Sequence, residues 1–530
     1  MQKFFNVAAD CRPDMHYMVK IDRQLRCIKK KVDRGEYFIM NRARQYGKTT
    51  TLKALKEYLK DEYIVISLDF QMLSNKDFLD ESNFTKSFVR EMLLAVSGIE
   101  GLRASAVEKL AAFAGKDNNA ANLSGLFCCL SYMCETSDKP VVLLIDEVDS
   151  ATNNQVFLDF LAQLRGYYIQ REVRSTFYSV ILAGVYDVKN LKRKIRPEEE
   201  RRTNSPWNIA TKFNVDMSFS MPEICDMLQE YESDHHTGMD VKAMAEWICD
   251  YTSGYPFLVS ALCKIMDEEI SGTEGFADDS EVWTKKGFLE AVKILLSEKN
   301  TLFDSMVNKL EEYQELRDMI YQILFQGNTI TYNPDNYSMD IGVMFGFIKV
   351  VDGIAVVSNR IFEMRFYNYF LSLAEMQNTD IYKRALQDKY CFVENGTLNM
   401  ERILERFVIC FSELYGNRDE KFLEDDGRRF FLLFLRPIIN GIGNYYIEAQ
   451  TRDSRRTDVI IDYLGKQYIV ELKIWHGEEY NRRGEEQLGG YLDVYHLKKG
   501  YMLSFNFNQN KKAGVKKVFC GDKTVIEAVV

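Results

Sequence analysis

Short apolar runs separated by amphipathic stretches mark the first part of the chain. Four segments are near-continuous apolar runs of strand length: YFIM (37–40), YIVISLDF (63–70), the first part of VVLLIDEVDS (141–150) and YSVILAGV (178–185). Helical spacing of apolar residues fills the intervals, for example in TLKALKEYLKDEY (51–63) and FTKSFVREMLLAV (84–96). Buried strands that alternate with helices predict an α/β fold, with a parallel sheet covered on both faces.

The pattern changes after about residue 215, where helical periodicity dominates. MPEICDMLQEYES, VKAMAEWICDYTS and PFLVSALCKIMDEEI predict a helical lid. From about residue 300, helices lead to two short strands that flank Asp352-Gly353, a hairpin turn pair, as in a winged-helix module. Beyond residue 377 the predicted order is helix, three strands, helix, strand, which indicates a separate α/β domain whose last strand is GYMLSFN (500–506). We therefore predict four parts, 1–215, 216–299, 300–376 and 377–530.

Charge and hydropathy narrow the classes of function. The 530 residues carry a formal net charge of −10, so the whole chain is not a general polyanion binder, and any contact with nucleic acid must be local. No stretch of about 18 uninterrupted apolar residues occurs, and the N-terminal segment has no apolar core typical of a signal peptide. We expect a cytoplasmic protein with no membrane partner.

The polar segment between the first predicted strand and the next helix has the composition of a phosphate-binding loop. Arg42-Ala-Arg-Gln-Tyr-Gly-Lys-Thr49 matches the second half of that pattern, with Arg42 where the first glycine is usual. Gly47 would let backbone N–H groups close on phosphates, Lys48 would reach the β and γ oxygens, and the Thr49 hydroxyl would complete Mg²⁺ coordination. A GKT tripeptide alone is more often a plain turn before a helix.

A second motif strengthens this interpretation. The apolar run VVLLI delivers Asp146 and Glu147 to the carboxyl end of a predicted strand, where open α/β sheets bind ligands. Asp146 would hold Mg²⁺ through water, and Glu147 would orient or activate the attacking water. The alternative is that both carboxylates only cap the next helix. Since each motif follows its own strand, we predict that the chain binds ATP, and leave open whether ATP is hydrolysed or only sensed.

Three segments, the GKT loop with Arg42 and Arg44, IDEVDS, and LAGVYDVKNL, resemble the bacterial AAA-like ATPase domains over roughly residues 14–372. In that family and its STAND-type relatives an SPxN segment follows the fourth strand, and a GxP motif packs near the adenine. Ser205-Pro206-Trp207-Asn208 and Gly254-Tyr255-Pro256 match those places. The expected nucleotide-binding residues are Arg44, Gly47, Lys48, Thr49, Thr50, Asp146 and Pro256.

Carboxylates and a lysine recur in the last part of the chain. Asp458 begins one predicted strand, and Glu471-Leu472-Lys473 ends the next. Strand alternation puts Glu471 and Lys473 on one face, with Leu472 turned to the core. Phosphodiester hydrolysis needs carboxylate oxygens for one or two Mg²⁺ or Mn²⁺ ions, and a cation that positions or deprotonates water. An ExK sequence alone is more often a surface ion pair.

Gln487-Leu-Gly-Gly-Tyr491, on the helix after the ExK strand, resembles the QxxxY motif of the RecB-like branch of PD-(D/E)XK nucleases, over roughly residues 395–515. The resemblance implies a restriction-endonuclease-like domain, with Gln487 and Tyr491 facing the site and one further acidic ligand. Glu448 is the first candidate for that ligand and Glu424 the second. A cluster of positive residues would either surround the carboxylates and bind the phosphate backbone of a nucleic acid, or form a solvated face. It comprises Arg452, Arg455, Arg456, Lys466, Arg482 and Arg483.

The leading hypothesis is an ATP-dependent switch that controls a metal-dependent DNA nuclease, in bacterial defence or mobile-element biology. The alternative is a STAND-like signalling ATPase whose PD-(D/E)XK domain is catalytically silent and binds nucleic acid or a protein. The intact set Asp458, Glu471 and Lys473 argues against silence. A metabolic P-loop kinase is disfavoured, because the last third shows no small-molecule pocket. The sequence leaves the oligomeric state open, a homo-oligomer included.

Overall fold

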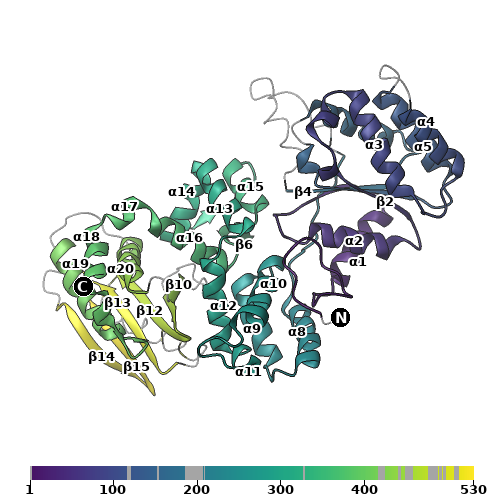
Figure 1. Ribbon diagram of the computed structural model, residues 1–530. Helices are drawn as coiled ribbons and strands as arrows, with labels where there is room; N and C mark the ends of the chain where they lie inside the picture. Colours follow the sequence, from purple (N-terminus) through teal and green to yellow (C-terminus); the bar gives the residue numbers. More distant parts are fainter. Residues whose placement is uncertain are drawn as a thin grey trace. The chain divides into compact units, whose positions relative to one another are not determined.

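A computed structural model gives the architecture (Figure 1). It describes residues 3–115, 121–151, 154–185, 207, 209–325, 329–415, 424–439, 443–447, 458–474, 488, 492, 497–506 and 512–530. The chain forms two compact units, Met1–Ser218 and Phe219–Val530. The finer boundaries expected from the sequence stay predictions.

The first unit is built on a four-stranded parallel sheet. Its strands are β1 (Tyr37–Asn41), β2 (Ile64–Asp69), β3 (Val141–Asp146) and β4 (Ser179–Gly184), in the order β1-β4-β3-β2. These are the four strands that the apolar runs predicted, and β3 and β4 are buried along their whole length. A fifth segment adds a single parallel bridge between Thr211 and Phe38 at the free edge of β1.

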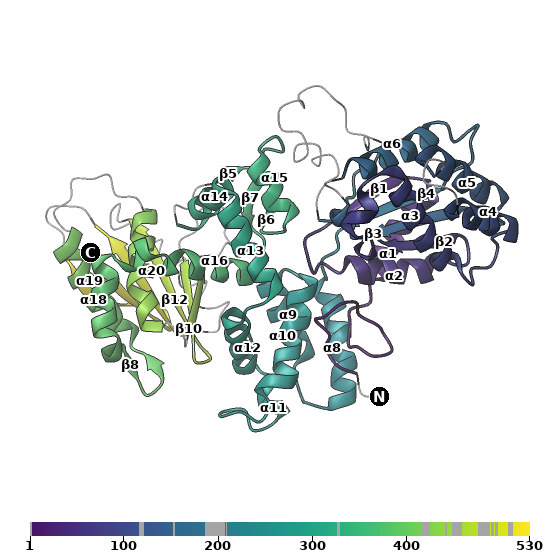
Figure 2. The ribbon, with the colours of Figure 1, turned by 45° about the horizontal axis from the view of Figure 1, so that its top comes forward.

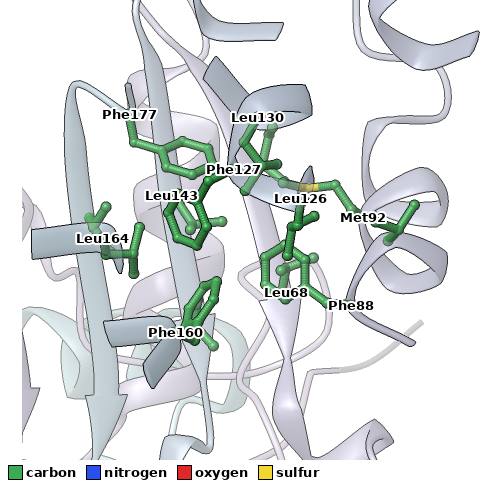
Figure 3. Packing of buried hydrophobic residues seen from close by; sticks show 14 of the residues in the cluster. Leu68, Phe88, Met92, Leu126, Phe127, Leu130, Leu143, Phe160, Leu164 and Phe177 are labelled. Atoms are coloured by element: carbon green, nitrogen blue, oxygen red, sulfur yellow. The ribbon is translucent and has the colours of Figure 1, made fainter. Parts of the chain in front are cut away.

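Helices cover both faces of this sheet, as predicted (Figure 2). α1 (Asp22–Asp33) and α2 (Lys48–Leu59) pack on one face. The other face is covered by α3 (Glu81–Val96), α4 (Ala104–Ala114), α5 (Leu123–Thr136) and α6 (Gln155–Ile169). Phe88, Leu126 and Phe160 meet the strand side chains there in an aromatic-rich core (Figure 3). Because successive strand residues point to opposite faces, Phe38 joins the first core and Ile39 the second.

The second unit begins with the predicted helical region. Its helices are α8 (Met221–His235), α9 (Val241–Thr252), α10 (Pro256–Ile265) with the π-helical turn Met266–Ile270, α11 (Asp279–Val282) and α12 (Lys285–Ser297). Ser220 and Glu223 form a capping box that starts α8, and the Asp240 side chain caps α9.

A helix-and-hairpin module follows. It comprises α13 (Thr301–Glu312), α14 (Gln314–Phe325), α15 (Tyr337–Met344) and a small sheet of β5 (Ile330–Thr331), β6 (Ile348–Val351) and β7 (Ile354–Val357). The predicted hairpin turn is present, since Asp352 and Gly353 both have positive φ, at 50° and 80°. The helices α16 (Arg360–Ser372), α17 (Ala374–Gln377) and α18 (Asp380–Asp388) then lead into the C-terminal region.

The C-terminal region contains a mixed six-stranded sheet with the order β10-β11-β12-β13-β15-β14 (Figure 1). Its elements are a short hairpin of β8 (Val393–Glu394) and β9 (Thr397–Leu398), helices α19 (Met400–Tyr415) and α20 (Glu424–Ile439), and strands β10 (Gly443–Ile447), β11 (Asp458–Tyr463), β12 (Lys466–Ile474), β13 (Lys499–Phe505), β14 (Gly514–Cys520) and β15 (Lys523–Val529). Rings of α19 pack against those of α20 and against Phe505 of β13.

Two strands of this sheet were not predicted. The sequence-based order ended with GYMLSFN, which is β13, and the expectation that this strand is the last was wrong, because β14 and β15 follow it. β15 pairs in parallel with β13, and β14 pairs antiparallel with β15 at the edge. The helix expected at 485–496 lies outside the described residues except for Leu488 and Leu492, which are helical and buried.

Candidate functional site

The loop Arg42–Thr49, here called the phosphate loop, runs from β1 into the first turn of α2. Gly47 caps α2 in the left-handed conformation, with φ 76°, and Gln45 has φ 56°. A glycine at such a position carries no Cβ penalty, and the first N–H groups of α2 have no partner within the helix. Backbone donors at the start of a helix favour an anion such as a phosphate group.

Lys48 is 7% exposed, and its side chain curls over the phosphate loop. Its Nζ donates to the carbonyl oxygens of Arg42 and Ala43, each at 3.0 Å. Burial lowers the pKa of the Lys48 ammonium, while the carboxylates of Asp149, Glu147 and Asp146 act in the opposite direction. The cation is thus held in the loop at the place from which a phosphate-binding lysine acts.

The two sequence motifs meet at a hydrogen bond. Thr49 Oγ1 donates to Asp146 Oδ2 at 2.7 Å, which joins the start of α2 to the carboxyl end of β3. Burial raises the pKa of Asp146, while the Thr49 hydroxyl and the Glu147 amide lower it. A hydroxyl and a carboxylate are hard oxygen donors, so this pair fits the chemistry that Mg²⁺ requires.

Glu147 follows Asp146 in an unusual backbone conformation. Its φ is 51°, which is uncommon for a residue other than glycine and is found more often at functional sites. Burial raises the pKa of the Glu147 carboxyl, the neighbouring Asp146 and Asp149 raise it further, and Lys48 opposes them. The raised pKa suits a general base beside bound phosphates.

Asp149 belongs to the same acidic group, although sequence reasoning did not select it. Its Oδ2 accepts a hydrogen bond from the Val185 amide at 2.6 Å, directly after β4. A Cβ on Gly184 would lie 2.8 Å from Asp149 Oδ1, so the strand end approaches this carboxylate closely. The signal was the third carboxylate in IDEVDS. Asp149 ties the end of β4 to the acidic residues after β3.

Arg42 and Thr50 make contacts that sequence reasoning did not anticipate. The Arg42 guanidinium donates to the Val215 carbonyl at 2.6 Å and lies 4.9 Å from the centre of the Phe213 ring. Arg42 therefore anchors the segment that leaves the first unit. Thr50 Oγ1 accepts from the Cys11 amide at 3.1 Å, and Arg44 is exposed.

The two motifs that the family resemblance added lie in different places. Trp207 is fully buried, with its ring centre 6.0 Å from that of Tyr37, so it packs in the core of the first unit. Ser205, Pro206 and Asn208 are outside the described residues. Pro256 belongs to the second unit, where it is buried in the first turn of α10. Its contact with an adenine stays a prediction.

The candidate metal site of the C-terminal region lies on β11 and β12. The antiparallel register places Asp458 directly opposite Glu471. Glu471 is fully buried, and its Oε1 lies 3.3 Å from Nζ of Lys473, which is also buried. The ion pair confirms that alternation brings Glu471 and Lys473 to the same face. A buried carboxylate beside a lysine, opposite a second acidic residue, fits the donor set of a hard divalent cation.

Several predicted members of this site cannot be placed. Gln487, Tyr491 and Glu448 lie outside the described residues, as do the arginines of the expected basic cluster, and the side chains of Asp458 and Glu424 are not described. Lys466 is described and exposed, and its position fits a solvated face, one of the two alternatives for the positive cluster. It starts β12, five residues or about 17 Å along the strand from Glu471, and donates to Thr397 Oγ1 at 2.9 Å.

The neighbouring strands β13 and β15 add polar residues to the same face of the sheet. Ser504 is opposite Lys473 in the β12·β13 register, and its Oγ lies 3.5 Å from Glu527 Oε1. Glu527 is 1% exposed and pairs with Lys516 at 2.7 Å. Glu527 lies two strands from Glu471, about 10 Å away. Sequence reasoning missed this carboxylate because it missed its strand.

Among the described residues, which leave out the side chain of Asp458, no group of three or more His, Cys, Asp or Glu side chains is arranged to hold a metal ion. Within the same part of the chain, no helix is both long and apolar enough to cross a membrane.

The parallel sheet, the phosphate loop between β1 and α2, and the carboxylates after β3 define the P-loop class of α/β nucleotide-binding folds. Residues 12–368 match the model of the AAA-like domain, and the chain belongs to that family. No curated protein matches the chain.

Solved structures share distant likenesses with this chain. A Walker-type ATPase of Pyrococcus abyssi has 13% identity and a TM-score of 0.44, over 68% of this chain and 99% of its own. The ORC1 protein of Aeropyrum pernix, solved in complex with DNA, has 13% identity and a TM-score of 0.28, over 66% of this chain and 93% of its own. At this distance neither carries an argument about what this chain binds.

Proposed function

We propose that this protein binds and hydrolyses ATP and thereby controls a metal-dependent DNA nuclease in its C-terminal region. The AAA-like domain supplies the ATPase part of this proposal. One observation carries the nuclease part: Asp458 is opposite Glu471, whose carboxylate is paired with Lys473 at 3.3 Å.

For the ATPase part, each residue has a task that its position supports. The N–H groups at the start of α2 and the Lys48 ammonium bind the phosphates, and Thr49 with Asp146 holds Mg²⁺. Glu147 accepts the proton of the attacking water, because burial places its pKa above that of an ordinary carboxylate. Asp149 keeps the end of β4 beside these groups through the Val185 amide.

For the nuclease part, Asp458 and Glu471 hold Mg²⁺ or Mn²⁺, and Lys473 positions or deprotonates the water that attacks the phosphodiester. A metal ion held by these residues would stabilise the negative charge that develops on the phosphate. Gln487, Tyr491 and Glu448 complete the proposed site. With a net charge of −10, the chain must attract DNA through local positive charge, for which the arginines around residues 452–456 and 482–483 are the candidates.

The test is cleavage of supercoiled plasmid and of single-stranded DNA by the full-length protein, with Mg²⁺ or Mn²⁺, with and without ATP. We expect cleavage that stops when EDTA removes the metal and whose rate changes when ATP is added. A protein that binds ATP but cleaves neither DNA in any nucleotide state would contradict the nuclease part. That result would favour a silent domain that binds nucleic acid or protein.

A further inference from the structure

A buried hydrogen bond joins the helical region to the strand that carries Asp458. Tyr251, near the end of α9, donates its hydroxyl to Asp462 Oδ2 on β11 at 2.8 Å. Gln467 on β12 donates to the other oxygen, Oδ1, also at 2.8 Å. Tyr251 and Asp462 are only 3% and 6% exposed. Both carboxylate oxygens are thus occupied, and one of the two donors comes from outside the sheet.

Charged residues of two further helices surround this hydrogen bond. Arg360, at the start of α16, lies over the Tyr251 ring at 5.4 Å and pairs with Asp250 at 2.6 Å. Burial raises the pKa of Asp462, while Gln467, Tyr251, Lys285 and Arg360 lower it. The carboxylate therefore sits among donors and cations from α9, α12 and α16. Removing one partner of a buried charged group is strongly destabilising. The contacts around the Asp462 carboxylate therefore favour a single relative position of α9 and β11.

Asp462 is well placed to position Asp458. The two residues are four apart on β11, which is paired on both sides, with β10 and β12. The hairpin turn after β11 also packs on α12, because a Cβ on Gly465 would lie 3.0 Å from Lys286 Cγ. Asp458 and Asp462 thus belong to one continuous hydrogen-bonded strand. A shift of α9 would therefore reach Asp458 through Asp462.

The end of α9 is fixed to the first residue of the second unit. Ser253 and Gly254 follow α9 with φ of 48° and 70°. The Gly254 carbonyl accepts from the Phe219 amide at 2.8 Å, and a Cβ on Gly254 would lie 2.0 Å from the Phe219 carbonyl oxygen. No side chain fits there, so α9 and Phe219 are in obligatory backbone contact.

The residue before Phe219 is held by the phosphate loop itself. The hydroxyls of Tyr46 and Ser218 are hydrogen-bonded at 2.9 Å. Arg23 on α1 donates to the Ser218 carbonyl at 2.7 Å, and Arg42 donates to Val215 at 2.6 Å. A phosphate bound at Lys48 would compete with the Arg42 and Ala43 carbonyls for the ammonium that they now share. The loop that would bind phosphate therefore also holds, through the Tyr46 and Arg42 side chains, the segment that leads into the second unit.

We propose that this path couples the phosphate loop to β11, so that nucleotide binding repositions Asp458 through Ser218, Phe219, the end of α9 and the Tyr251–Asp462 hydrogen bond. The proposal names the regulation of the candidate nuclease site and in that respect rests on the proposed function. The coupling itself does not require cleavage. Tyr251 and Asp462 act as positioning residues, since neither belongs to the proposed catalytic set.

The experiment compares the full-length parent with Tyr251→Phe, which removes only the hydroxyl. Amide hydrogen exchange of Val459–Tyr463 is measured with Mg²⁺, with and without a non-hydrolysable ATP analogue. In the parent we expect the analogue to change the exchange rate of these amides by about fivefold or more, which is the lower end of ordinary allosteric coupling. In Tyr251→Phe the response of β11 should be lost, while analogue affinity and exchange in the phosphate loop stay as in the parent.

Tyr231→Phe is the matched control. Tyr231 also donates a buried hydroxyl to a carboxylate, that of Asp267 at 2.5 Å, but both residues lie within the helical region. This variant should keep the β11 response, and thermal melting of both variants establishes that they are folded. A parent in which the phosphate loop responds and β11 does not would overturn the coupling, as would a full response in Tyr251→Phe. Absence of DNA cleavage by the parent would refute the proposed nuclease and leave the exchange result decisive for the coupling.

Discussion

At the scale of single residues, Lys48 is the group on which nucleotide binding depends most. Its ammonium is buried in the phosphate loop and bonded to two loop carbonyls. Lys48→Ala should abolish measurable ATP binding, because it removes the cation closest to the β and γ phosphates. Isothermal titration with ATP and Mg²⁺ measures this. Lys53→Ala on the same helix is the control, since Lys53 is exposed and paired with Asp10, and micromolar affinity in Lys48→Ala would refute the phosphate-loop assignment.

Glu147 allows a test of hydrolysis separate from binding. Glu147→Gln should keep ATP affinity and slow turnover by about 10²- to 10⁴-fold, because the amide cannot accept a proton. Only the ionised carboxylate is a base, and burial raises its pKa. Parent turnover should therefore rise with pH through a value above the ordinary pKa of about 4.3. A pH–rate profile measures both effects; equal turnover in variant and parent would make Glu147 a structural residue.

At the scale of elements, the turn between α9 and α10 depends on Gly254. Gly254→Ala should destabilise the second unit by more than the ~1–2 kcal/mol usual for a left-handed alanine. The added Cβ would also collide with the Phe219 carbonyl, 2.0 Å away.

Urea unfolding compares this variant with Gly238→Ala. Gly238 also has a positive φ, 78°, but nothing lies within 4 Å of its Cβ position. The difference in unfolding free energy between the two variants measures the cost of the close contact with Phe219. Equal losses of stability would show that the backbone shifts easily to relieve this contact.

The elements that the sequence predicted well are those whose pattern is local. The strands of the first sheet are continuous apolar runs. In the second unit, the turn residues Asp352-Gly353 alone mark the β6–β7 hairpin. β14 and β15 were missed although they form a hairpin with each other around Gly521-Asp522; only the parallel pairing of β15 with β13 joins segments further apart in the sequence. Glu527 reads as a surface residue until β14 brings Lys516 beside it. Likewise, nothing near Arg42 in the sequence shows that its side chain binds Val215.

The candidate sites follow the same division. Thr49 and Asp146 were predictable because each follows a strand, and parallel strands end at one edge of the sheet. The pairing of Glu471 with Lys473 followed from alternation. Tyr251 gave no signal, since an aromatic residue at helical spacing is ordinary core until a partner carboxylate from another element is known.

At the scale of the whole molecule, the two proposed sites lie in separate compact units. Asp458→Ala should remove metal-dependent cleavage, and Lys473→Ala should disable it while metal binding largely persists, because lysine acts on water and developing charge and does not coordinate. Neither change should abolish ATP binding, because neither residue belongs to the phosphate loop. A cleavage assay, a metal titration and an ATP titration on the same preparations measure this.

Asp522→Ala provides the control for that series. Asp522 is exposed in the turn between β14 and β15, and its removal should leave cleavage at the parent level. Parent-level cleavage by Asp458→Ala or Lys473→Ala would refute the proposed nuclease site.

The strand order of the C-terminal sheet has a consequence for synthesis on the ribosome. β15 is made after β14, yet it lies between β13 and β14. Domains generally fold from the N-terminus as the chain emerges. β14 therefore has no partner in this sheet until residues 523–529 have left the exit tunnel, long after the phosphate loop is complete. A nascent chain would thus complete the first unit before it completes the six-stranded sheet that carries the proposed nuclease site.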